Sequence, residues 1–265
     1  MDFTGQVIWI TGASSGIGEG LALALDRLGA NLVLSSRRAE ELERVRAACT
    51  RPEAHLVLPL DLAQSATFTA LTAQVVARFG RIDLLVNNGG VSQRALATAA
   101  TEATERQLME IDYFGPIALT KAVLPTLRRQ GAGKIVVVSS VMGYAGTPGR
   151  SSYAAAKHAL HGYFDSLRAE LWREGIKILI VCPGYVQTAV STNALQADGG
   201  RHGRTDATHR RGIPVERCVR AILKGIARNR EEIAVGGPEV AAIYLKRWLP
   251  WLYSRVVRRL EFTTK

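Results

Sequence analysis

The chain has 265 residues and a formal net charge of +11, because 34 Lys and Arg residues outnumber 23 Asp and Glu residues. This length suits one α/β domain with a full hydrophobic core, and no linker or low-complexity segment divides it. The cysteines Cys49, Cys182 and Cys218 form no Cys-x-x-Cys pair and are odd in number, which argues against a disulfide framework and favours a reducing, cytoplasmic location. No long uncharged apolar run is present, so we expect a protein that is soluble or at most peripheral to a membrane.

Apolar, strand-like runs alternate with helical patterns along the chain. The strands are expected at residues 6–11, 31–36, 54–60, 82–87, 133–139, 176–182 and 231–235. Strands separated by helices in this way form parallel βαβ units. The sequence therefore predicts a single domain of the Rossmann type, in which seven parallel strands form one doubly wound sheet with helices on both faces.

A glycine-rich turn follows the first expected strand. Gly12, Gly16 and Gly18 stand between that strand and a helical pattern over residues 19–28. Gly12 permits a tight turn, Gly16 lets the backbone approach a pyrophosphate, and Gly18 lets the helix pack closely. Because the helix N-terminus would face the phosphates with free amides, this order of elements predicts a dinucleotide site.

The end of the second expected strand indicates which dinucleotide is bound. An acid usually binds the ribose 2′-hydroxyl of NAD at this place, whereas a 2′-phosphate needs cations. Here the residues are Ser36, Arg37 and Arg38. Since the planar guanidinium fork suits phosphate, the sequence favours NADP over NAD.

Three side chains near the middle of the chain have the chemistry of an acid/base site. Tyr153 and Lys157 are four residues apart in a helical pattern, and Ser140 follows an expected strand. The spacing places the phenol and the ammonium on one helix face, where the cation favours the phenolate. Ser140 would hold a substrate oxygen beside the phenol, so we expect proton transfer at a carbonyl or alcohol.

Together these motifs resemble the short-chain dehydrogenase/reductase family. The stretches that carry the resemblance are TGASSGIG at 11–18, NNGG at 87–90, SSVMG at 139–143, YAAAK at 153–157 and PGYVQT at 183–188. The stretch from PGYVQT through ADGGRHG at 183–203, followed by Pro214, Val215 and Glu216, resembles more narrowly the dehydrogenase/reductase member-7 branch. The resemblance implies an NADP(H)-dependent oxidoreductase that interconverts an apolar ketone or aldehyde and its alcohol by hydride transfer, as a homodimer or homotetramer.

The resemblance also implies roles for individual residues. Ser140, Tyr153, Lys157 and Asp112 would be catalytic, with Tyr153 as the general acid/base and Lys157 also on the nicotinamide ribose. Asp112 replaces the family's asparagine, so it either keeps the backbone contact of that residue or opposes phenolate formation. Asp61 would contact adenine, Asn87 would border the adenosine ribose, and Thr188 would hold the carboxamide. The full set expected at the cofactor is Gly12, Ser14, Ser15, Gly16, Ile17, Gly18, Ser36, Arg37, Arg38, Asp61, Leu62, Asn88, Gly89, Gly90, Tyr153, Lys157, Pro183, Gly184, Val186 and Thr188.

The last quarter of the chain carries most of the excess charge. Residues 185–212 are expected to form a lid on the substrate cleft, and residues 238–265 a basic, aromatic extension. Residues 240–260 combine Trp248 and Trp251 with five Lys or Arg and no acid. Such a segment either lies on a membrane surface or packs on its own domain or a second subunit. No nucleic-acid module accompanies the charge, and the five histidines show no metal-ligand spacing.

Two other functions are compatible with the residues. The basic carboxyl-terminal quarter would suit an acidic carrier protein, which gives a 3-oxoacyl carrier-protein or acyl-thioester reductase as one alternative. The other is a non-catalytic protein that senses a cofactor or contacts a membrane. Asp112 in place of the family's asparagine favours this alternative, whereas the intact Ser140, Tyr153 and Lys157 argue against it.

Overall fold

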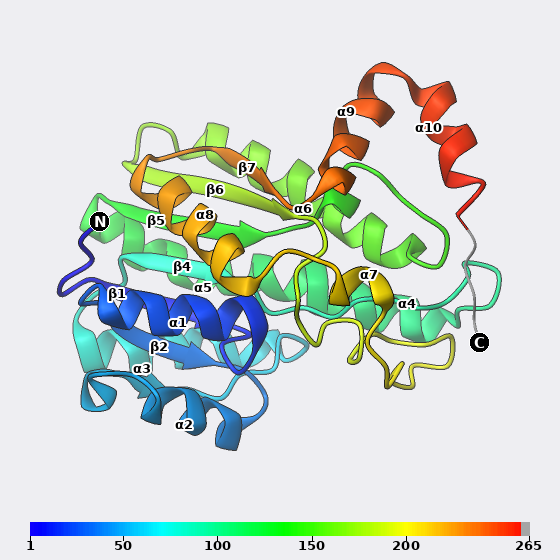
Figure 1. Cartoon of the computed structure of the whole chain (residues 1–265). Helices are drawn as coiled ribbons and strands as arrows, with labels where there is room; N and C mark the ends of the chain where they lie inside the picture. The colour runs from blue at the N-terminus through cyan, green and yellow to red at the C-terminus, as the bar shows by residue number, and fades with distance from the viewer. Residues whose placement is uncertain (261–265) are drawn as a thin grey trace.

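Figure 1 shows the computed structural model of the chain, which describes residues 1–260. Its strands are β1 (Val7–Thr11), β2 (Asn31–Ser35), β3 (Leu56–Val57), β4 (Leu84–Asn87), β5 (Gly133–Val138), β6 (Ile176–Pro183) and β7 (Glu232–Val235). They form one seven-stranded sheet in the order β3-β2-β1-β4-β5-β6-β7, and all neighbouring strands are parallel. The predicted doubly wound sheet is confirmed.

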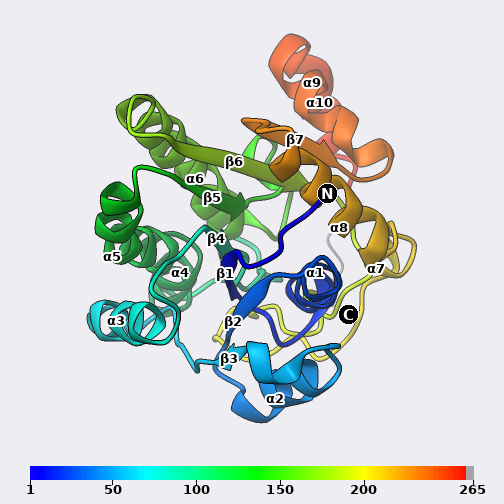
Figure 2. The ribbon, with the colours of Figure 1, turned by 90° about the vertical axis from the view of Figure 1, so that its left-hand side faces the viewer.

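Helices cover both faces of the sheet, as Figure 2 shows along the strands. They are α1 (Gly16–Arg27), α2 (Ala39–Ala47), α3 (Phe68–Phe79), α4 (Glu102–Met109), α5 (Gly115–Gln130), α6 (Ser151–Glu170), α7 (Ala207–Arg210), α8 (Val215–Ala227), α9 (Ala241–Trp248) and α10 (Pro250–Val257). Short helical turns occupy Pro52–Ala54, Ser65–Thr67, Val141–Gly143 and Pro238–Val240, and a π-helical turn occupies Glu110–Phe114. Helices α1, α2 and α8 lie on one face, and α3, α5 and α6 lie on the other.

The central strand β1 shows how the sequence builds both cores. Alternate side chains of a strand point to opposite faces. Ile8 and Ile10 belong to the cluster under α1 and α8, whereas Val7 and Trp9 belong to the cluster under α5 and α6. The Trp9 indole donates to Ser35 Oγ at 2.8 Å, which satisfies its buried N–H. A strand that is apolar on both faces is therefore what the parallel sheet requires.

The strand predicted over 54–60 was too long. Pro52–Ala54 form a helical turn, and regular pairing covers only Leu56–Val57. Single hydrogen bonds from Leu58 N to Leu34 O and from Leu60 N to Ser36 O, at 2.9 and 3.0 Å, carry the chain on along β2. Pro59 lies between these donors, and its missing N–H is tolerated because β3 is an edge strand. The other six strands begin and end within two residues of their predicted bounds.

The sheet changes its direction of winding between β1 and β4. Thr11 Oγ1, at the end of β1, accepts hydrogen bonds from Asn88 N at 3.0 Å and Gly89 N at 2.9 Å, just after β4. The two turns are thereby joined at the carboxyl edge of the strands. Ligands of open α/β sheets bind in the crevice at this switch point, so the fold itself selects this edge.

Candidate active site

The glycine-rich turn after β1 leaves no room for a side chain at its glycine positions. Gly12 and Gly16 have φ of +65° and +58°, which favour glycine. A Cβ on Gly12 would lie 2.8 Å from Asn88 Nδ2 and from Gly89 Cα, and one on Gly18 would lie 2.2 Å from the Gly12 carbonyl oxygen. The turn therefore presents bare backbone at the start of α1, as a phosphate-binding turn must.

The PGYVQT segment lies against the same turn. A Cβ on Gly16 would meet Thr188 Cγ2 at 3.0 Å, so the glycine turn and Thr188 face each other although the sequence separates them widely. Pro183 ends β6, and Val186 is buried. The sequence predicted that both segments serve one cofactor, and the structure brings them together; their roles in binding stay predictions.

The two arginines after β2 differ in what their side chains contact. The exposed Arg38 reaches back over the glycine turn, where its Nη2 lies 3.0 Å from Ser14 Oγ and 3.4 Å from Ser15 Oγ. Ser36 Oγ accepts a hydrogen bond from the Arg38 backbone N–H at 3.1 Å. Arg37 is also exposed, and within residues 1–260 its side chain has no hydrogen bond or ion pair. The geometry therefore places Arg38 nearer to the expected phosphate position than Arg37.

The turns after β3 and β4 supply the remaining expected cofactor residues. Asp61 is half-buried and its Oδ1 accepts a hydrogen bond from Ala63 N at 3.0 Å, which shapes the turn after β3. Asn87 differs from the expectation that it borders a ribose. It is 3 % exposed and its amide donates to Thr120 Oγ1 at 2.9 Å, so its side chain points into the core. The neighbouring Asn88, whose Nδ2 donates to Thr11 O at 3.0 Å, lies beside the glycine turn instead.

The three residues expected to be catalytic lie at the ends of two adjoining elements. Ser140 follows β5, and its Oγ accepts from Met142 N at 3.1 Å and lies 3.4 Å from Pro183 O. Tyr153 and Lys157 lie on α6, with Lys157 Nζ 5.5 Å from the centroid of the Tyr153 ring. Tyr153 is half-buried, whereas Lys157 is buried. The helical spacing predicted from the sequence thus places the ammonium beneath the phenol ring.

Asp112 forms a buried ion pair with this lysine. Its Oδ2 lies 3.2 Å from Lys157 Nζ, its Oδ1 accepts from Val91 N at 2.7 Å, and its side chain has no exposed surface. Burial raises the pKa of Asp112 despite the nearby ammonium. Burial alone would lower the pKa of Lys157, but the Asp112 carboxylate raises it. The Asp112 carboxylate therefore offsets part of the positive charge of Lys157. From the sequence, this charge was expected to act on the Tyr153 phenolate alone.

The π-helical turn Glu110–Phe114 explains how the carboxylate reaches Lys157. Such a turn inserts an extra residue into a helix and changes the direction in which side chains point. Here it falls between α4 and α5 and turns Asp112 into the core, against α6. A π-turn at this position is typical of a functional site, and no periodicity of the sequence indicates it.

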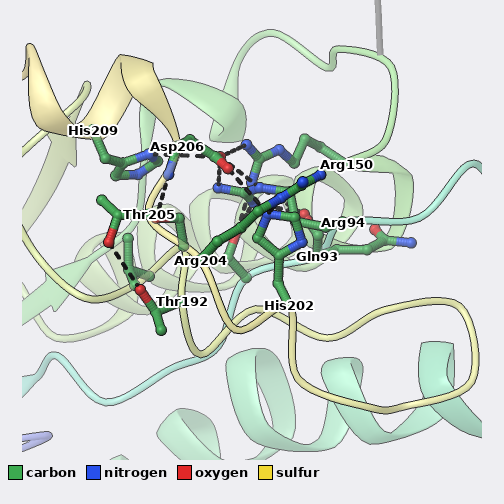
Figure 3. A network of polar contacts seen from close by, with 12 residues as sticks. Gln93, Arg94, Arg150, Thr192, His202, Arg204, Thr205, Asp206 and His209 are labelled. Atoms are coloured by element: carbon green, nitrogen blue, oxygen red, sulfur yellow. Dashed lines mark hydrogen bonds and ion pairs between the residues drawn. The ribbon is translucent and has the colours of Figure 1, made fainter. Parts of the chain in front are cut away.

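The expected lid, residues 185–212, is tied to the loop that follows β4. Arg94 N donates to Leu195 O at 2.7 Å, and Leu195 N donates to Ser92 O at 2.8 Å. The buried Arg94 guanidinium also pairs with Asp206 at 2.5 Å (Figure 3). Movement of this segment as a lid stays a prediction. The sequence reasoning missed Arg94 and Asp206, because they are 112 residues apart and belong to no motif.

Within residues 1–260, two clusters of potential metal ligands form from residues distant in the sequence, which histidine spacing did not reveal. They are Asp26, Cys49 and His55, and His161, Cys182 and Glu232. His55 Nε2 lies 3.0 Å from Asp26 Oδ1, and its Nδ1 accepts from Leu32 N at 3.2 Å. His161 Nε2 lies 2.9 Å from Ser139 Oγ. These hydrogen bonds account for the histidine positions, so we assign no metal to either cluster.

Helices α9 and α10 project from the body of the molecule as an antiparallel pair (Figure 1). Tyr253 Oη donates to Gly146 O at 2.5 Å and Lys246 Nζ lies 3.5 Å from His158 Nε2, which fix the pair beside α6. Trp248 and Trp251 are 75 % and 60 % exposed. In residues 1–260 no helix is both long and apolar enough to cross a membrane. The last five residues of the expected extension 238–265 lie outside the described part.

Comparison with known proteins gives one consistent family. Residues 6–199 match the family described as short chain dehydrogenase. The chain is 40 % identical to human dehydrogenase/reductase SDR family member 7, with 97 % of this chain and 79 % of the relative covered. It is 39 % identical to a Drosophila melanogaster SDR family protein 7-like, with 96 % and 80 % covered.

Solved structures agree with the sequence relatives. A short-chain dehydrogenase from Streptomyces avermitilis matches with a TM-score of 0.84 and 31 % identity, covering 98 % of this chain and all of that one. An alcohol dehydrogenase from Thermococcus sibiricus, complexed with 5-hydroxy-NADP, has the same fold with a TM-score of 0.75, 24 % identity, and coverage of 88 % and 97 %. The chain therefore belongs to the short-chain dehydrogenase/reductase family, whose members are oxidoreductases that use a nicotinamide cofactor.

Proposed function

We propose that this protein is an NADP(H)-dependent oxidoreductase that interconverts an apolar ketone or aldehyde and the corresponding alcohol. The observation that carries the proposal is the half-buried Tyr153 phenol above the buried Lys157 ammonium, on the helix that packs against the turn of Ser140. Proton transfer to a substrate oxygen uses a proton donor, a cation that favours the charged form of that donor and a hydroxyl that holds the oxygen, and these three side chains supply them.

The catalytic side chains have different parts in the proton transfer. In reduction Tyr153 donates its phenolic proton to the carbonyl oxygen, and in oxidation its phenolate takes the proton back. The Ser140 hydroxyl donates to the same oxygen; its present contact with Pro183 O is long, at 3.4 Å, so this donor is readily redirected. Lys157 keeps its proton through the pair with Asp112 and favours the phenolate.

The cofactor site fits the same reaction. When bound, NADP(H) supplies the hydride chemistry. The bare backbone at Gly12 and Gly16 would take the pyrophosphate, with the amides at the start of α1 as donors. Arg38 would bind the 2′-phosphate, and Thr188 would hold the carboxamide. Lys157 would bind the nicotinamide ribose.

A substrate screen tests the proposed function. Purified protein is mixed with NADPH and acetophenone, benzaldehyde or 2-decanone, and NADPH absorbance is followed; the matching alcohols are tested with NADP. Turnover of at least one apolar carbonyl compound is expected. An acetoacetyl thioester serves as a further arm, and turnover of the thioester alone would replace the proposal with an acyl-thioester reductase. A protein that binds NADPH and turns over none of these compounds would contradict an enzymatic role.

Arg38 is expected to decide between the two cofactors. Arg38→Ala should weaken NADPH binding by about 10-fold or more and leave NADH binding within about two-fold, because a charge-assisted bond to the 2′-phosphate is lost. Arg37→Ala should have the same direction with a smaller effect, since that side chain does not reach the turn. Arg46→Ala is the control, because Arg46 lies on α2, the helix that begins directly after Arg38 in the chain, and is paired with Glu43 at 2.7 Å. Equal losses for NADPH and NADH in binding titrations would refute the assignment.

We also propose that α9 and α10 bind an anionic membrane surface. Trp248 and Trp251 are exposed beside Arg247 and Arg255, and Arg255 lies 5.8 Å from the Trp251 ring. Aromatic side chains with cations and without acids match the interface of an anionic bilayer. Packing against a second subunit is the alternative to membrane binding. It would need an acidic patch on that subunit to match the arginines.

Vesicle sedimentation tests this surface. The protein should sediment with phosphatidylserine vesicles at low salt and be released by added salt, because the attraction is screened within a Debye length. Changing both Trp248 and Trp251 to Ala should abolish sedimentation, whereas Trp172→Ala, an equally exposed tryptophan on the body with Arg173 over its ring, should not. Light scattering runs in parallel: a change of oligomeric state with no vesicle effect would support the subunit interface instead.

A further inference from the structure

The catalytic helix α6 begins without a cap of its own. The first amides of a helix lack intrahelical partners. Arg150, in the N-cap position, makes no hydrogen bond from its side chain to these amides. Gln93 caps these amides instead, because its Oε1 accepts hydrogen bonds from Ser152 N at 2.9 Å and from Tyr153 N at 3.2 Å. The amide of the acid/base residue itself is therefore held by a side chain from another part of the fold.

Gln93 is a rigid partner. Its side chain is fully buried on the loop after β4, 60 residues from Tyr153 in the sequence. Its side-chain oxygen Oε1 makes both bonds to α6, while within the described residues its Nε2 has only a 3.5 Å contact with Ser151 Oγ. Since no water competes at a buried amide, loss of this acceptor leaves two N–H groups unsatisfied. The acceptor oxygen is thus the part of Gln93 that matters to α6.

An ion-pair network fixes the backbone of Gln93, as Figure 3 shows. The backbone carbonyl oxygen of Gln93 accepts hydrogen bonds from Arg94 Nη1 at 2.7 Å and from Arg150 Nη1 at 3.0 Å. Both guanidiniums also reach Asp206 Oδ2, at 2.5 and 3.4 Å. This network joins three segments at Gln93: the loop after β4, the start of α6 and, through Asp206, the segment before α7.

We propose that Gln93 is a positioning residue that sets the place of the Tyr153 phenol; this rests on the function proposed above. Lys157 is already fixed by Asp112 and by the Val138 carbonyl oxygen at 3.3 Å. Tyr153 lies one turn nearer the helix start, where first turns fray unless they are capped. The bond from Gln93 holds that turn, and a misplacement of about 1 Å at a reacting group can cost ~10²-fold in rate.

Three variants test the role. Gln93→Met removes the acceptor at similar volume, and Gln93→Glu keeps an acceptor oxygen. Gln130→Met is the matched control, because Gln130 also holds a distant backbone, accepting from Ile82 N at 3.0 Å and donating to Ile82 O at 2.7 Å, at the opposite edge of the sheet. Gln93→Met should lower kcat by roughly 10- to 100-fold with the NADPH Kd within about two-fold, and Gln93→Glu should recover most of that loss. Gln130→Met should leave kcat within about two-fold.

Equal kcat for Gln93→Met and Gln130→Met, or a Gln93→Glu protein no faster than Gln93→Met, would overturn the proposal. Hydrogen exchange gives a readout that needs no substrate. The amides of Ser152 and Tyr153 should exchange faster in Gln93→Met than in the wild-type protein or Gln130→Met. If no carbonyl compound is turned over, the proposed function fails, and unchanged exchange at these two amides would reject the positioning role separately.

Discussion

Tyr153→Phe is expected to lower kcat by at least ~100-fold while leaving the Kd for NADPH within about two-fold, because only the proton-carrying oxygen is lost. The ring keeps its place above Lys157, where the ammonium lies 5.5 Å from its centroid. The loss should appear in kcat and kcat/KM alike, since the phenol acts on the substrate oxygen in the transition state. Steady-state kinetics with the best compound of the screen measure it.

Tyr163→Phe is the control for this change. Tyr163 lies on the same helix ten residues later and packs edge-on against Tyr113 and Phe164, away from the trio on the helix surface. Its loss should leave kcat within about two-fold. A Tyr153→Phe protein that retains more than about a tenth of wild-type kcat would remove the acid/base role from this residue.

The sequence predicts most reliably what local backbone chemistry decides. The glycine turn was found because Gly12 and Gly16 need positive φ and Gly18 needs bare backbone beside it, and these demands limit the residue type directly. The pairing of Tyr153 with Lys157 follows from helical spacing. The alternation of strands and helices likewise predicts the parallel sheet, apart from the edge strand β3, whose regular pairing covers only Leu56–Val57 and whose expected start is a helical turn.

Long-range contacts were not predictable in the same way. Nothing near Gln93 in the sequence indicates that its oxygen caps a helix 60 residues later. Asn87 and Asn88 are neighbours of the same type, yet one points into the core and the other to the glycine turn, because side chains alternate along β4 and its end. The same limit applies to the arginines after β2, because the sequence does not indicate that Arg38 reaches Ser14 and that Arg37 does not.

The Asp112 and Lys157 pair was anticipated only as one of two alternatives, and the structure shows the direct ion pair. Lys157→Met should therefore damage more than catalysis. It removes the cation beneath Tyr153 and also leaves the Asp112 carboxylate buried without a partner, which typically costs about 3–5 kcal/mol of folding free energy. We expect lost turnover, weaker NADPH binding and a clearly lower urea midpoint.

The stability loss should depend on pH with a defined sign. Burial already raises the pKa of Asp112, and removal of Lys157 takes away a group that opposes this rise. A carboxyl whose folded pKa lies above its unfolded value stabilises the fold at low pH and loses this contribution as pH rises through the folded pKa. Relative to wild type, Lys157→Met should therefore be less destabilised near pH 5 than near pH 8.

A double variant separates the catalytic part of Lys157 from its structural part. In Asp112→Asn with Lys157→Met no buried charge remains, and the Asn oxygen still accepts from Val91 N, so the urea midpoint should recover and its extra pH dependence should disappear. Turnover should stay lost, because the cation that favours the phenolate is still missing. Recovery of both stability and turnover would show that Lys157 serves only to neutralise Asp112. Recovery of neither would mean that the pair contributes through packing, since a removed charge could then not explain the loss.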